Sequence, residues 1–192
     1  MKWMIFRLIA VCFFSAVVAL ATVVWRAPDP RYKLAELAAM GRFSEFDREI
    51  AEVAKASRID PRLLKSMAWK ASGFHPGAVS GGRRGLLLVR EAAARQWAAV
   101  MRVDSFMLTD LSDARTNLQA GAWVLARALE RWKGRDDTLA FALAEFYAGR
   151  EEIERRGAGF DTAAGMLRMT GRETREFVEA VISRFRFYGI ED

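Results

Sequence analysis

Few side chains in this sequence could do chemistry, and most of those are carboxylates and guanidinium groups. One cysteine, Cys12, and one histidine provide neither an internal disulfide nor the ligands of a zinc site. Arg83 and Arg84 stand side by side in a glycine-bounded loop, where guanidinium groups can pair with carboxylates of a ligand. Glu91 and Glu145 could transfer protons if the fold turned them toward a groove. We expect neither to be catalytic: Glu91 would stabilise a helix N-terminus, and Glu145 would lie on a solvated helix face.

The most informative signal is a series of short blocks in a fixed order along the chain. The blocks are Asp60–Leu64 followed by Trp69–Ser80, then Gly85–Leu88, Asp113–Gly121, Ala144–Gly149 and Glu173–Val178. They look like DPxLLxAIxxxESGFNPxAVS, GLMQ, DPxTNIxxG, AAYNAG and ETRxYV. These patterns are typical of the catalytic domain of the soluble lytic transglycosylases, relatives of goose-type lysozyme. Each block alone is weak, but the ordered series, over roughly residues 50 to 188, makes the resemblance strong.

The resemblance implies an enzyme that cuts the glycan strands of peptidoglycan with a single glutamic acid. In the family this acid protonates the glycosidic oxygen and then acts as a base while the sugar closes a 1,6-anhydro ring. The matching position here is Ala71, whose methyl group can neither donate nor accept a proton. Leu88 stands where the family has glutamine, and Phe146 and Tyr147 replace its tyrosine and asparagine. A kept scaffold with lost polar groups is typical of a pseudoenzyme, and it also fits a decaying gene.

A binding groove could remain without catalysis. The candidate residues for it, in chain order, are Ser72, Phe74, Arg83, Arg84, Leu88, Asn117, Phe146 and Tyr147. Trp69 and the other aromatic residues among them could face sugar rings, although aromatic residues at helical spacing more often belong to a core. Arg83 and Arg84 could pair with carboxylates of the stem peptides. His75 occupies a loop position where the family has asparagine, and we expect it to be exposed.

The N-terminal segment is expected to bring the rest of the chain to the membrane. Lys2 and Arg7 precede an uncharged run from Leu8 to Trp25, which as a helix would measure about 27 Å, close to a bilayer core. Positive charge before this run favours a cytoplasmic N-terminus. Ala19-Leu20-Ala21 would also suit cleavage of a signal peptide. Apolar residues continue beyond that point, so we favour an uncleaved anchor, and either interpretation places residues 30–192 on the outer, periplasmic side.

Helical periodicity in the rest of the chain predicts an all-α class, and the resemblance implies a lysozyme-like domain behind one transmembrane helix. We expect a transmembrane signal anchor at 1–26, a linker with a first helix at 27–43, broken at Ala27–Pro30, and the lytic transglycosylase-like domain at 44–192. The helices are expected from Ser44 to about Ala56, from Pro61 to Ser72, from Glu91 to Met101, from Asp113 to Lys133, from Asp137 or Thr138 to Gly149, and through Phe177–Phe185. A short hairpin is possible between Gly73 and Gly85.

Composition leaves several functions open and makes others unattractive. The chain is 52% hydrophobic with a formal net charge of +6, which suits a folded domain whose surface attracts polyanions. The basic residues are scattered and accompany no phosphate-binding or zinc-finger motif, so we expect no nucleic acid, metal or cofactor. We expect peptidoglycan glycan strands or cell-wall proteins as partners. Two alternatives remain: an active enzyme using Glu145 or Glu91, and a protein-binding module whose groove Leu88 and Phe146 make more apolar.

Overall fold

The computed structural model describes residues 2–26, 30, 33–34, 38, 41–157, 160 and 162–188. Contacts within the chain divide it into two units, Met1–Ser44 and Glu45–Asp192. Most of the expected break at 27–30, and more than half of the expected linker at 27–43, lie outside the described residues.

The first unit contains helix α1, Lys2–Arg26, of 25 residues. Its window Ile9–Arg26 has a mean hydropathy of 2.1, and none of it is buried. Within the described residues it is the one helix that is long and apolar enough to cross a bilayer. A signal sequence at the N-terminus would have the same length and composition.

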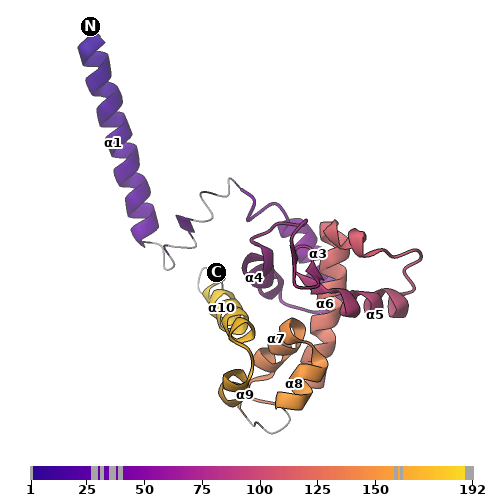
Figure 1. Ribbon diagram of the computed structural model, residues 1–192. Helices are drawn as coiled ribbons and strands as arrows, with labels where there is room; N and C mark the ends of the chain where they lie inside the picture. The colour runs from indigo at the N-terminus through magenta and orange to yellow at the C-terminus, as the bar shows by residue number, and fades with distance from the viewer. Residues whose placement is uncertain are drawn as a thin grey trace. The chain divides into compact units, whose positions relative to one another are not determined.

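The second unit is built almost entirely of helices (Figure 1). They are α3 (Asp47–Ser57), α4 (Pro61–Ser72), α5 (Glu91–Met101), the 3-10 helix η1 (Leu108–Ser112), α6 (Ala114–Arg131), α7 (Thr138–Ala148), α8 (Arg150–Gly157), α9 (Ala163–Met169) and α10 (Arg172–Tyr188). The expected all-α class is therefore confirmed.

Two aspartates start the helices that matter most for the site. The Asp60 carboxylate accepts a hydrogen bond from the Arg62 backbone N–H, with Pro61 at the first helical position of α4. Asp113 caps α6 in the same way through the backbone N–H of Thr116. The expected cap at Ser44 is wrong, because its hydroxyl donates to the Gly41 carbonyl and α3 begins only at Asp47.

A small antiparallel sheet interrupts the helices. Its strands β1 (Val79–Ser80), β2 (Arg83–Arg84) and β3 (Val89–Arg90) pair in the order β1-β2-β3. Gly81 and Gly82, with φ of 52° and 71°, form the turn between β1 and β2, a conformation that favours glycine. The hairpin expected between Gly73 and Gly85 is therefore present, and β3 extends it.

Helix α6 lies at the centre of the second unit and packs against α3, α5 and α7, while α10 packs on α4 and α7 (Figure 1). Leu118, Ala122 and Leu125 on α6 are fully buried. A Cβ at Gly121 would lie 2.4 Å from Cδ1 of Leu87, so only glycine lets the loop between β2 and β3 approach this helix. The central helix therefore supports the loop that carries the GLMQ-like block.

Candidate functional site

Ala71 lies in the last turn of α4 and is partly buried. The helix ends at Gly73, whose left-handed φ of 59° lets its N–H donate to the carbonyl of Trp69 over 3.0 Å. Phe74 follows with φ of 63° and a fully buried side chain. Phe74 therefore belongs to the core, and its ring does not face a ligand.

Ser72 connects the end of α4 to the GLMQ-like block. Its Oγ donates to the Leu86 carbonyl over 2.7 Å and accepts from the His75 backbone N–H over 3.1 Å. The exposed His75 ring also contacts Ser72, with Nδ1 2.8 Å from the Ser72 carbonyl oxygen. This hydroxyl consequently holds the loop beside Ala71 in place.

Asn117 on α6 also holds this loop, through hydrogen bonds of its side-chain amide. Its Oδ1 accepts from the Leu87 N–H over 2.8 Å, and its Nδ2 donates to the carbonyls of Arg84 and Leu111 over 2.8 and 3.0 Å. The side chain is fully buried, so Asn117 positions Gly85–Leu88 and is not a surface for a ligand. Leu88, at the glutamine position, is partly exposed and has a left-handed φ of 47°, which is uncommon for a branched side chain.

The two arginines of β2 have different partners, as expected for neighbours on a strand. Arg84 pairs with Glu91, with Nε 2.9 Å from Oε1. The Arg83 guanidinium lies 4.1 Å from the centre of the Tyr147 ring and donates to the Tyr147 carbonyl over 3.3 Å. Strand β2 and the C-terminal end of α7 therefore meet through Arg83 and Tyr147, which the sequence had placed in one groove.

An aromatic stack fixes the AAYNAG-like block against α10. The Tyr147 ring stacks on Phe177 with centroids 4.8 Å apart, and its hydroxyl lies 3.3 Å from Oε2 of Glu173. Burial raises the pKa of the Tyr147 hydroxyl above its ordinary value. Phe146, only 5% exposed, also faces Phe177 and therefore belongs to the core.

Glu145 corrects the sequence prediction, which had placed it on a solvated helix face. The residue is 7% exposed, and its Oε1 lies 2.8 Å from Nη1 of Arg131. Its other oxygen, Oε2, accepts from the Trp132 indole N–H over 2.8 Å. The prediction failed because α7 is buried all round over Ala140–Phe146, so no face of that stretch meets solvent.

A cavity of about 820 Å³ opens where the start of α5, the middle of α6, the end of α7 and α8 meet. Arg90, Trp123, Arg127 and Glu145 are among its lining residues. The Arg90 Nε and Nη2 atoms donate to the carbonyls of Tyr147 and Ala148 over 3.0 and 2.6 Å. Burial lowers the pKa of Arg90 below its ordinary value, and the nearby charge of Arg83 adds to that effect.

Three residues of the cavity wall were not predicted from the sequence: Arg90, Trp123 and Arg127. The Arg127 guanidinium lies over the Trp123 ring, 4.8 Å from its centre, on the wall of the cavity. The available signal was Trp123 itself, which lies on the predicted Asp113–Lys133 helix but outside its apolar stripe of Leu118, Gly121, Ala122, Leu125, Leu129 and Trp132. In the described part of the chain no three His, Cys, Asp or Glu side chains are grouped to hold a metal ion.

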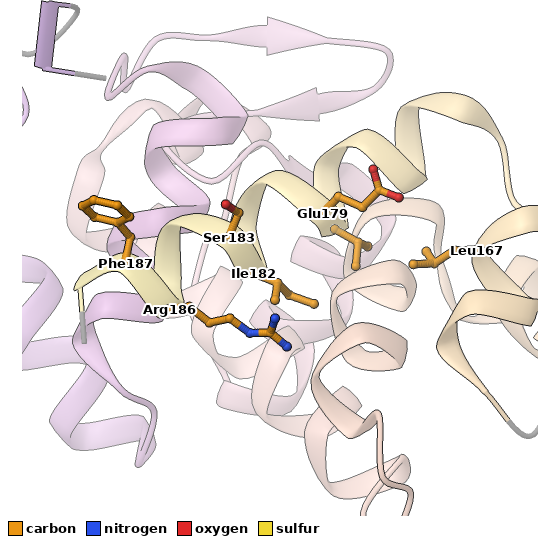
Figure 2. A pocket seen from close by; sticks show the side chains of 7 residues that line it. Leu167, Glu179, Ile182, Ser183, Arg186 and Phe187 are labelled. Atoms are coloured by element: carbon orange, nitrogen blue, oxygen red, sulfur yellow. The ribbon is translucent and has the colours of Figure 1, made fainter. Parts of the chain in front are cut away.

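A second cavity, of about 400 Å³, lies between α9 and α10. Figure 2 shows Ile182, Ser183 and Arg186 on α10, with Leu167 beside them from α9. None of the candidate site residues lines it. It is therefore separate from the loop, strand and helix end described above.

Known structures resemble this fold. An inactive mutant of the lytic transglycosylase Slt from Pseudomonas aeruginosa is 20% identical, with a TM-score of 0.64 over 74% of this chain and 23% of its own. The 70 kDa soluble lytic transglycosylase from Escherichia coli is 18% identical, with a TM-score of 0.65 over 76% of this chain and 24% of its own. A 70 kDa soluble lytic transglycosylase bound to bulgecin A gives a TM-score of 0.66 at 18% identity, over 77% of this chain and 24% of its own.

These likenesses confirm the expected lysozyme-like helical fold, and this chain spans about a quarter of each of those proteins. No curated protein sequence matches the chain. The family model described as the Transglycosylase SLT domain matches residues 48–166, more than half of the chain. The chain therefore belongs to the transglycosylase SLT domain family.

Proposed function

We propose that this protein is a membrane-anchored member of the family that binds the glycan strands of peptidoglycan without cutting them. The observation that carries the proposal is Ala71, at the end of α4 where the family's pattern has its catalytic glutamic acid. The acid and base roles of that residue typically account for about 10² to 10⁴ in rate. An alanine there supplies neither role.

The two carboxylates that the sequence offered as replacements are both engaged. Glu145 has one oxygen on Arg131 and the other on the Trp132 N–H. Glu91 is held by Arg84 at 2.9 Å. A general acid must present a proton to the glycosidic oxygen, and neither carboxylate can do so without leaving its partner. This supports binding over catalysis.

The cavity beside the end of α7 suits a glycan. Its volume of about 820 Å³ lies within the range typical of ligand sites, and polar side chains line much of it. Trp123 contributes an indole to the wall, and aromatic rings offer an apolar face to the C–H groups of a sugar. Tyr147, which the sequence placed in the groove, is connected to the cavity through Arg90, a lining residue that donates to its carbonyl.

The location of the domain in the cell is part of the same proposal. Helix α1 would serve as the anchor and leave residues 30–192 on the periplasmic side, where peptidoglycan lies. The division into an anchor at 1–26, a linker at 27–43 and a glycan-binding domain at 44–192 follows from it. The alternative, a cleaved signal peptide, delivers the same domain to the same side, and immunoblotting of membrane fractions distinguishes the two by size.

Co-sedimentation with purified peptidoglycan tests the binding. The full chain in detergent is expected to pellet with the sacculi, and Trp123→Ala is expected to weaken this binding on the order of 10-fold. Met101→Ala is the matched control, because Met101 is 57% exposed and lies outside the cavity. A protein that stays in solution with every peptidoglycan preparation would favour the third interpretation, a protein-binding module. Phe146 is too buried to make such a groove more apolar.

Mass spectrometry of the soluble fraction tests the absence of cleavage. After long incubation we expect no 1,6-anhydromuramyl products, while an active lytic transglycosylase in a parallel sample releases them. Products that depend on this protein would contradict the proposal.

A second candidate, an active enzyme with a displaced acid, is favoured by one observation. Glu173 is exposed, and its carboxylate lies 3.3 Å from the Tyr147 hydroxyl at the edge of the AAYNAG-like block. If anhydro products appear and are lost in Glu173→Gln, this second function replaces the first.

A further inference from the structure

We infer that the glycan held in the large cavity carries a free carboxylate, and that Arg90 is the residue that receives it. This inference rests on the proposed function and names the chemical class of its ligand. On a peptidoglycan strand, the carboxylate closest to the sugar rings is that of the lactyl group of muramic acid, which is free once the stem peptide has been removed. Neutral strands of N-acetylglucosamine lack that group.

Arg90 is held in place by groups that leave much of its charge uncompensated. Two of its five N–H groups donate to the carbonyls of Tyr147 and Ala148, at the C-terminal end of α7. These carbonyls carry only the partial negative charge of a helix terminus. Among the described residues no carboxylate lies within ion-pair distance of Arg90, so three N–H donors remain for a ligand.

Arg83 adds a second positive charge next to Arg90, which favours the binding of an anion there. Its guanidinium donates to the same Tyr147 carbonyl that Arg90 contacts, so two positive charges share one acceptor. Burial and this neighbouring charge both lower the pKa of Arg90, which means that each disfavours its charged form. A bound carboxylate would relieve the repulsion between the two guanidinium groups and replace the water that Arg90 has lost.

Gly149 leaves the Arg90 guanidinium uncovered. A Cβ at position 149 would lie 3.5 Å from both Cζ and Nε of Arg90, so any side chain there would cover the planar group. The backbone φ of 97° at this position also favours glycine. Arg90 and Gly149 both line the cavity, which makes the uncovered guanidinium part of the binding wall.

The acidic side chains of the cavity do not compete strongly for Arg90. Glu145 pairs with Arg131, Glu154 with Arg150, and Glu152 with Arg155. Each of these arginines also lines the cavity, so these acids and bases compensate one another. Outside these three pairs the lining has Arg90, the exposed Glu151, and Arg127, which is stacked on Trp123, so it carries an excess of one positive charge. A sugar on the indole and a carboxylate on Arg90 would use both features.

The experiment compares two forms of one glycan with the full chain in detergent. Peptide-free glycan strands keep their lactyl carboxylates, and carbodiimide coupling to methylamine converts them to neutral amides of the same length. We expect the charged strands to bind on the order of 10-fold more tightly in isothermal titration calorimetry, with a preference that falls as salt rises. Equal affinity for the two forms would overturn the inference while leaving glycan binding intact. No binding of either form would contradict the proposed function itself.

A set of variants assigns the preference to Arg90. Arg90→Gln is expected to bind both forms equally, and Arg90→Lys to keep part of the preference because it keeps the charge. Arg95→Gln is the matched control, an exposed arginine of α5, the helix that follows Arg90, and it lies outside the cavity. If Arg90→Gln kept the full preference, the carboxylate would bind elsewhere. If that variant failed to fold, the comparison of the two glycans with the natural protein would still decide whether the carboxylate is recognised.

Discussion

The indole N–H of Trp132 donates to the carboxylate of Glu145 over 2.8 Å, and both side chains are buried. The second carboxylate oxygen pairs with Arg131 from the same helix, α6. Helices α6 and α7 are thus joined by a charged group in the interior. Such a group is costly to bury and is retained only when its oxygens are paired. Glu145 therefore has a structural function in this fold, which weakens its candidacy as a displaced catalytic acid.

Replacing Glu145 by alanine is expected to lower the free energy of unfolding by about 3 kcal/mol, because the buried Trp132 N–H and the partly buried Arg131 guanidinium lose their acceptor. Glu145→Gln should cost less, since the amide oxygen can still accept one hydrogen bond. Urea unfolding of the full chain in detergent measures the difference. Glu151→Gln, at an exposed position, is the control and should change stability by less than about 0.5 kcal/mol. A neutral Glu145→Ala would contradict this structural role.

The Asn117 side chain packs closely against Gly85 and holds the Gly85–Leu88 loop on α6. Substitutions at either residue should therefore destabilise the fold. Asn117→Ala leaves the Leu87 N–H and the carbonyls of Arg84 and Leu111 without their partner, and should destabilise by about 3 kcal/mol. Gly85→Ala should be similarly harmful, because the added Cβ would lie 2.0 Å from Nδ2 of Asn117.

Gly77→Ala is the control for this contact. No atom lies within 4 Å of the position of its Cβ, and its backbone is not left-handed, so unfolding curves should stay close to those of the natural protein. If Gly77→Ala and Gly85→Ala lowered stability equally, the loop would be sensitive to any added side chain. The close contact between Gly85 and Asn117 would then not explain the result.

Local signals predicted the helices that carry their own start and stop residues. Asp60-Pro61 and Gly73 fixed both ends of α4, and α5 runs from Glu91 to Met101 as expected. Helices α8 and α9 were missed because α8 is short and highly charged, and its formation depends on neighbours in space. Tertiary packing decided these elements, and a single sequence does not display it.

The sequence named candidate residues for the site, and the structure shows which of their side chains meet. Arg83, from the loop beside the site, and Tyr147, from the AAYNAG-like block, were both groove candidates, and the two side chains do meet. Arg90 was missed because its importance comes from the two carbonyls that it holds, in a segment 57 residues further along the chain. Glu145 was misjudged because helical position alone does not tell which neighbouring helix will cover a side chain.

The two aspartate caps predict how stability depends on pH. The backbone N–H of Thr116 holds the pKa of Asp113 below its ordinary value, and Arg62 does the same for Asp60. Because both folded-state values are lowered, their contribution is complete above the ordinary value near 3.8 and is lost as pH falls through the lowered values. Asp113→Asn keeps a cap without the charge, so the loss of stability between about pH 6 and pH 2.5 should become smaller, by about a few tenths of a kcal/mol because Asp113 is exposed and screened by solvent.

Urea midpoints across that pH range measure the effect of Asp113→Asn. The control is Asp104→Asn, at an exposed position that caps no helix, and it should leave the pH dependence unchanged. An unchanged slope in Asp113→Asn would mean that other carboxylates govern acid unfolding.

The last prediction concerns the restored acid, Ala71→Glu. We expect it to release few or no anhydro products, at least 10²-fold below an active relative, because a misplaced catalytic group typically loses about that factor. The supporting polar groups of the family pattern are missing as well. Leu88 stands at the glutamine position, Phe146 is buried against Phe177, and the Tyr147 hydroxyl faces Glu173.

Mass spectrometry of the soluble products decides between Ala71→Glu and a second variant that also carries Leu88→Gln, Phe146→Tyr and Tyr147→Asn. Circular dichroism and urea midpoints first establish that both fold as the natural protein does. If the missing neighbours are the reason for inactivity, the combined variant should exceed the single one. Full turnover by Ala71→Glu alone would show that the glutamic acid is the one catalytic group lost and that its surroundings still orient it.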